Sequence, residues 1–181
     1  MATTSRLMTV EQFRQLPETG PFYYELRHGE LVQVTRPKFR HTRIQKCLEQ
    51  LLERAAGDTA VVTIEFAFRA LPEHELRVAD VACIAKERWE KIDPDDNLRG
   101  APELVVEVLS PSNTATEIYD KEKLCLENGC REFWVVDAAR RQVKVSTPDG
   151  HTTTYHAGQE IPLRQFADGA LAVDAVFAGI V

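Results

Sequence analysis

An almost continuous apolar stretch spans residues 104–109 and is interrupted only by Glu107. Apolar residues at both odd and even positions are typical of a central strand that is covered on both faces of a sheet. Because side chains alternate between the faces of a strand, Glu107 is predicted to share a face with Val105 and Leu109. A carboxylate in such a layer needs a cation, a metal ion or a proton. A structural salt bridge, or a strand end that reaches water, would also satisfy it.

A helix is predicted after this strand and a short turn. Thr114 and Glu117 have capping-box spacing, which marks the start of the helix. One stripe of side chains at three- and four-residue spacing is expected to face the strand, and its members are Ile118, Lys121, Leu124 and Cys125. Lys121 is therefore predicted to point inward. Lys123 is aligned instead with Glu127, where an ion pair suits an exposed face.

The remaining pattern predicts helices and strands in a mixed order. Helices are expected over residues 9–16, 39–55 and 86–91, and strands over residues 23–26, 30–34, 61–70, 78–85, 132–136, 142–146 and 152–156, with a loop at 93–101. This order predicts the α/β (α+β) class. We expect a mixed central sheet flanked by helices, with an N-terminal hairpin and additional β structure at the C-terminal end.

Two neighbouring strands carry further acids. Glu65 lies in the strand at 61–70, on the side opposite to an apolar set that comprises Val62, Ile64, Phe66 and Phe68. Asp80 lies in the strand at 78–85, on the same face as Val78, Ala82 and Ile84. The two strands are therefore expected to bring Glu65 and Asp80 onto one sheet.

The composition is that of an ordinary globular protein, with 181 residues, 44% hydrophobic and 28% charged. We expect one domain over residues 1–181. No apolar stretch is long enough for a membrane span, and the first residues lack the layout of a signal peptide. The four cysteines form no CxxC pair and are interpreted as core residues in a reducing compartment. We therefore expect a cytoplasmic protein without a membrane partner.

The net charge of −6 argues against broad, non-specific binding to nucleic acid. One segment differs from this average, because five basic residues and His41 occur there without an acid. The five are Arg36, Lys38, Arg40, Arg43 and Lys46. This basic stripe could contact phosphates, or it could be a solvated helix face.

Phosphodiester hydrolysis uses residue types that occur together in this chain. They are three strand acids and one inward lysine, namely Glu65, Asp80, Glu107 and Lys121. Carboxylate oxygens hold a divalent cation that polarises the phosphoryl oxygen. A lysine orients the attacking water or offsets charge in the transition state. The same combination of types also occurs by chance in many folds, so the spacing by itself is a weak signal.

The order of Asp80 and Glu107 resembles the PD-(D/E)xK motif of the restriction endonuclease-like superfamily. More closely, the chain resembles a large bacterial family classed as endonucleases, the Uma-type family, over about residues 9–137. The matching segments are Tyr24-Glu25-Leu26, Gly29-Glu30-Leu31, Val78-Ala79-Asp80-Val81, Pro102-Glu103-Leu104-Val105-Val106-Glu107-Val108-Leu109-Ser110-Pro111-Ser112, Lys121, Gly129 and Phe133-Trp134-Val135-Val136-Asp137.

This resemblance implies a Mg2+- or Mn2+-dependent endonuclease that hydrolyses DNA phosphodiester bonds, commonly as a homodimer. It implies Asp80, Glu107 and the backbone carbonyl of Val108 as metal ligands. The motif departs from the usual pattern in two places, since Ala79 replaces its proline and Leu109 occupies its lysine position. In this family the lysine lies on the following helix, a position that Lys121 matches.

Three residues are second-rank candidates for the site: Glu65, His41 and Glu25. Each also has a structural interpretation, which for Glu25 is a solvated strand residue. Two other functions stay open. One is a non-cleaving module that keeps the fold and binds nucleic acid or protein, and the other is a metal hydrolase that acts on a small phosphate ester.

Overall fold

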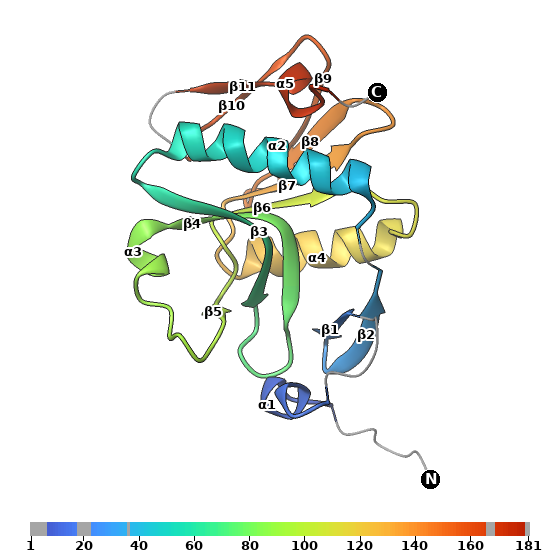
Figure 1. Ribbon diagram of the computed structural model, residues 1–181, viewed down its shortest axis with the longest axis vertical. Coiled ribbons are helices and arrows are strands. Elements are labelled where there is room, and N and C mark those ends of the chain that lie inside the picture. Colours follow the sequence, from blue (N-terminus) through green and yellow to red (C-terminus); the bar gives the residue numbers. More distant parts are fainter. Residues whose placement is uncertain (1–6, 18–22, 36, 166–168, 180–181) are drawn as a thin grey trace.

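The protein is described by a computed structural model that covers residues 7–17, 23–35, 37–165 and 169–179 (Figure 1). The helices are α1 Val10–Arg14, α2 Phe39–Ala56, α3 Lys86–Trp89, α4 Ala115–Glu127 and α5 Val173–Val176. The strands are β1 Tyr23–Arg27, β2 Glu30–Val34, β3 Ala60–Arg69, β4 Arg77–Ala85, β5 Leu98–Arg99, β6 Leu104–Val108, β7 Glu132–Asp137, β8 Gln142–Ser146, β9 Thr152–His156, β10 Glu160–Pro162 and β11 Ala170–Ala172. None of the helices in these ranges is long and apolar enough to cross a membrane.

Seven strands form the central sheet in the order β5-β3-β4-β6-β7-β8-β9. Neighbours in the sheet are antiparallel except for the parallel pairs β3–β5 and β6–β7, so the sheet is mixed. The N-terminal hairpin β1–β2 and the pair β10–β11 lie outside it. The predicted fold class is therefore confirmed. One detail was not predicted. The segment 93–101, which was expected to be a loop, contains β5, and β5 pairs with β3.

The two long helices cover opposite faces of this sheet (Figure 1). On the α2 face, buried residues of α2 pack with Leu104, Val106 and Val108 of β6. On the α4 face, Leu124 of α4 packs with Val105 of β6. All five residues of β6 are buried, as expected for a strand with a helix layer on each side.

The helix starts follow the local sequence signals. Thr9 and Thr114 each accept a hydrogen bond from the backbone N–H three residues later, and the side chains of Gln12 and Glu117 reach back to complete both capping boxes. On α4, Lys121 is buried, whereas Lys123 is exposed and lies 4.0 Å from Glu127. The predicted orientation of the two lysines is therefore confirmed.

The predicted alternation of β3 is wrong beyond Ile64. Val62 and Ile64 pack on the α2 face, but Phe66 and Phe68 pack on the α4 face. The cause is Glu65, whose φ of 51° lies in the left-handed region, so the backbone there is not extended. The pairs on each side of Glu65, Ile64 with Val81 and Phe66 with Ala79, keep one register, which places Glu65 opposite Asp80.

Asp80 departs from its predicted face for a related reason. Ala82 and Ile84 pack on the α4 face, whereas Asp80 reaches His41 and Gln45 of α2. The period-two rule fails at this point of β4, opposite the left-handed residue of β3.

A non-glycine residue in the left-handed region costs on the order of 1–3 kcal/mol. Glycine adopts this conformation without strain, so we expect the Glu65→Gly variant to be more stable than the Glu65→Ala variant. The free energy of unfolding should differ by about 1–2 kcal/mol, measured by urea denaturation without metal ions. Both variants lose the carboxylate, so the comparison isolates the backbone. Ala67→Gly in the same strand is the control, and it should destabilise by about 0.5–1 kcal/mol. Equal stability of the two Glu65 variants would contradict backbone strain at this position.

Candidate active site

Asp80 and Glu107 lie where β4 and β6 separate. The pairing of these strands runs from Cys83 with Leu104 to Val81 with Val106 and stops there. Beyond it, the backbone N–H of Val108 donates to Oδ2 of Asp80 at 2.6 Å. The backbone N–H of Asp80 donates to Oε1 of Glu107 at 3.4 Å. The two carboxylates therefore meet at the point where side chains take over from the ladder of backbone bonds.

Lys121 reaches this point from α4. Its Nζ lies 2.7 Å from Oε1 of Glu107 and donates to the carbonyl of Val78 at 2.7 Å. Burial lowers the pKa of Lys121, but the charges of Glu107, Glu25 and Asp80 outweigh burial and raise the pKa to about 12. The ammonium group is therefore a permanent positive charge beside Glu107.

At the Glu107 carboxyl, burial rather than the neighbouring charge sets the direction of the pKa shift. Burial raises its pKa to about 7, since burial and the charge of Asp80 together exceed the attraction of Lys121. Attraction to the ammonium group alone would lower this pKa. Burial decides the direction because Glu107 is only 7% exposed and faces a second acid.

Glu25 is not the solvated strand residue of one sequence interpretation, because only 4% of it is exposed. Its Oε1 accepts from the backbone N–H of Val78 at 3.0 Å, and its Oε2 accepts from Arg27 at 2.8 Å. Burial raises its pKa, but the charges of Lys121 and Arg27 outweigh burial and lower it overall. Glu25 and Lys121 thus hold the N–H and the carbonyl of Val78, two residues before Asp80.

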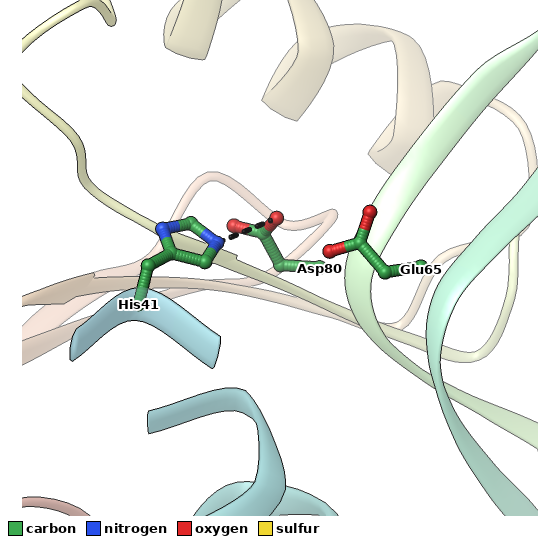
Figure 2. A group of neighbouring side chains, drawn as sticks. All are labelled: His41, Glu65 and Asp80. Carbon is green, nitrogen blue, oxygen red and sulfur yellow. Dashed lines mark ion pairs between the residues drawn. The ribbon is translucent and has the colours of Figure 1, made fainter. Parts of the chain in front are cut away.

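His41 of α2 and Glu65 of β3 lie on either side of Asp80 (Figure 2). Nε2 of His41 lies 3.0 Å from Oδ1 of Asp80. One ligand atom from each of the three residues lies within 4.8 Å of the other two. Burial lowers the pKa of His41, but the hydrogen bond and charge of Asp80, with the charges of Glu65 and Glu107, raise it overall. Two of the three second-rank residues of the sequence, His41 and Glu65, therefore lie directly beside Asp80.

Gln45 is part of this site, although the sequence pattern did not single it out. It is completely buried, and its Nε2 donates to Glu65, to Oδ1 of Asp80 at 3.2 Å and to the Asp80 carbonyl at 3.3 Å. A signal existed, because Gln45 is a polar residue on the inward stripe of α2, four positions after His41.

The basic stripe lies at the start of α2 and along its exposed face. Arg36 lies outside the described residues. Lys38, Arg40, Arg43 and Lys46 lie on α2 or at its N-cap, and all four are exposed. Nζ of Lys46 lies 2.8 Å from Oε2 of Glu49, so this lysine is partly neutralised. Lys38 and Arg40 flank the start of α2, the part of the helix that carries His41.

A mixed sheet between helices, with clustered acids where two central strands part and a lysine from the next helix, defines the nuclease-like fold class. Comparison with known proteins agrees. Residues 10–174 match the model of the Uma2 family, described as "Putative restriction endonuclease", and the chain belongs to this family. A solved structure from Anabaena variabilis ATCC 29413, described as "a putative nuclease belonging to DUF820", shares the fold, with a TM-score of 0.79 and 22% identity over 94% of this chain and 97% of that one. No curated protein matches the chain.

The raised pKa of Glu107 predicts a pH dependence of stability in metal-free protein. Between its ordinary pKa of 4.5 and about 7, the folded state keeps a proton that the unfolded state has released. The contribution of Glu107 to the free energy of unfolding is therefore full below this window and falls as pH rises through it. Urea denaturation at about pH 5 and about pH 8 should show a larger decrease in wild type than in Glu107→Gln.

Glu127→Gln, which removes an exposed carboxylate from the end of α4, is the matched control and should follow wild type. A Glu107→Gln variant with the same pH dependence as wild type would show that Glu107 does not hold this proton.

Proposed function

We propose that the protein is a divalent-metal-dependent endonuclease that hydrolyses DNA phosphodiester bonds. The observation that carries the proposal is the meeting of Asp80, Glu107 and Lys121 where β4 and β6 part. The family description and the description of the solved neighbour both name nucleases, which supports nucleic acid as the substrate. The motif lysine is absent from β6, and the ammonium group of Lys121 takes its place 2.7 Å from Glu107.

The residues present fit a Mg2+ or Mn2+ ion. Asp80 and Glu107 supply hard carboxylate oxygens, and the N–H contact to Asp80 brings the peptide of Val108 to the same place, with its carbonyl as the proposed third ligand. A bound cation would supply Lewis-acid polarisation of a phosphoryl oxygen. Both carboxylates are anchored by backbone N–H groups, which preorganises them before any ligand arrives.

Lys121 contributes charge rather than base catalysis, because its high pKa keeps it protonated. From its position beside Glu107 it can donate a hydrogen bond to the attacking water and offset negative charge that develops on the phosphoryl oxygens. Its contact with the Val78 carbonyl, and that of Glu25 with the Val78 N–H, fix the segment of β4 that leads to Asp80.

The test is a plasmid-nicking assay with Mg2+ or Mn2+. Asp80→Asn should abolish nicking, and Lys121→Ala should lower its rate on the order of 10²–10³-fold while metal binding persists. Lys123→Ala is the matched control on the same helix, because its exposed pair with Glu127 contributes little, and it should nick at the wild-type rate.

Full activity of Asp80→Asn would refute the mechanism. Absence of nicking by the wild-type protein would instead favour a binding module that keeps the nuclease fold.

The exposed cations at the start of α2 are proposed to contact the DNA backbone. The double change Lys38→Glu with Arg40→Glu should weaken duplex binding. It should also reduce the slope of log affinity against log salt by about one unit for each phosphate that the protein no longer neutralises. Filter binding across a salt series measures both quantities.

The control reverses two charges near the other end of α2. Arg54 lies in the last turn of α2. Lys91 follows α3, whose first residue donates a backbone hydrogen bond to Thr59, just beyond the end of α2. Arg54→Glu with Lys91→Glu changes the net charge equally, so an equal weakening in the control would assign the effect to net charge rather than to a contact surface.

Three further expectations complete the proposal. We propose a cytoplasmic location, supported by four cysteines that are all free. A homodimer and a single domain over residues 1–181 stay predictions.

A further inference from the structure

The carboxylate of Asp80 has two differently occupied oxygens. Oδ2 accepts the Val108 N–H at 2.6 Å and is therefore directed toward β6 and Glu107. Oδ1 is directed toward α2, where it lies 3.0 Å from Nε2 of His41 and 3.2 Å from Nε2 of Gln45. Asp80 can thus serve one ligand on the β6 side and another on the α2 side.

Glu65 is delivered to the α2 side of Asp80 by an unusual backbone conformation. Its φ of 51° breaks the extended backbone of β3 opposite Asp80. Its carboxylate accepts a hydrogen bond from the side-chain amide of Gln45, which also donates to Asp80. His41, Glu65 and Asp80 each place a ligand atom within 4.8 Å of the others (Figure 2). Two carboxylates and one imidazole therefore converge from α2, β3 and β4.

The protein atoms alone leave this group incomplete. Oε1 of Gln45 and Nδ1 of His41 are buried and have no hydrogen-bond partner among the described residues. Gln45 is 0% exposed, and its amide end lies against both carboxylates. Because buried polar side chains are nearly always paired, an unpartnered amide oxygen here points to a ligand that the chain itself does not supply.

The charges point to a cation. Lys121 is the buried ammonium group nearby, and it is engaged by Glu107 and the Val78 carbonyl on the α4 face. On the α2 face, His41 forms an ion pair with Asp80 when its ring is protonated. The exposed position of Glu65 leaves this side open for entry from solvent. A dication would therefore balance two carboxylates whose side of the sheet is opposite to the ion pair of Lys121 with Glu107.

We propose that His41, Glu65 and Asp80 form a binding position for a first-row transition-metal dication on the α2 side of Asp80. Imidazole nitrogen suits transition metals, whereas Mg2+ and Ca2+ favour an all-oxygen set. The position therefore takes Mn2+ in preference to Mg2+. This inference extends the proposed function and rests on it only through Asp80, which is also the ligand proposed on the β6 side.

The test uses the full chain stripped of metal, with Mn2+ and Mg2+ as the probes. Calorimetry should show that His41→Gln and Glu65→Gln each weaken Mn2+ binding at least about tenfold, since even outer-shell changes at metal sites cost about 10–100-fold. Binding of Mg2+ should change much less in His41→Gln. Electron spin-echo spectroscopy of bound Mn2+ should show nitrogen coupling in wild type and none in His41→Gln.

His151→Gln is the matched control, because His151 also pairs with an aspartate, at 2.9 Å from Asp149, but in the exposed turn between β8 and β9. It should keep both the affinity and the nitrogen coupling. Circular dichroism and urea denaturation of each variant without metal establish that an absent signal does not reflect unfolding.

Two outcomes separate this inference from the proposed function. Mn2+ binding that survives His41→Gln and Glu65→Gln, lacks nitrogen coupling and disappears in Glu107→Gln would overturn the α2-side position and leave the nuclease proposal standing. If nitrogen coupling persists in Glu107→Gln and the wild-type protein nicks no DNA, the α2-side position is supported while the nuclease proposal fails. Absence of Mn2+ binding in wild type would overturn the inference.

Discussion

The hydrogen bond from the Val108 N–H to the Asp80 carboxylate is the interaction on which the rest of the site depends. It lies beyond the last backbone pair of β4 and β6, so a side chain holds the strands together where the ladder has ended. The bond fixes the direction of the Asp80 carboxylate and places it beside Glu107. Removing the carboxylate would leave a backbone N–H of a buried strand without its acceptor, which is costly.

Buried side chains of opposite charge stabilise the point where β4 and β6 separate. Glu25, Glu107 and Lys121 are each less than a tenth exposed, and the charges of both acids act on Lys121. A buried ion pair recovers its desolvation cost only when further hydrogen bonds satisfy its members. The N–H and carbonyl of Val78 provide such bonds to Glu25 and Lys121. The same groups that make burial tolerable therefore hold the catalytic candidates in place.

The two faces of the sheet divide the site into different chemical environments. On the α4 face, the ammonium group of Lys121 lies against Glu107. On the α2 face, His41 and Gln45 lie against Asp80 and Glu65, and buried polar atoms of His41 and Gln45 have no partner among the described residues. Asp80 belongs to both environments, because β4 and β6 separate there and its carboxylate can contact groups on the α2 face and on the β6 side. A regular antiparallel pair would have directed it to one face only.

Local signals in the sequence determined the elements and several orientations. The capping boxes at Thr9 and Thr114, the buried strand around Glu107, and the inward Lys121 with outward Lys123 all depend on neighbours within one turn or one strand. Periodicity is sufficient for such features, because the helix and the extended strand each fix the direction of successive side chains. Tertiary structure alone decided the burial of Glu25, the contacts of Gln45 and the meeting of His41 with Asp80. It also decided the left-handed conformation of Glu65, which reverses the faces of β3, and period-two counting cannot anticipate it because the rule assumes a backbone that stays extended.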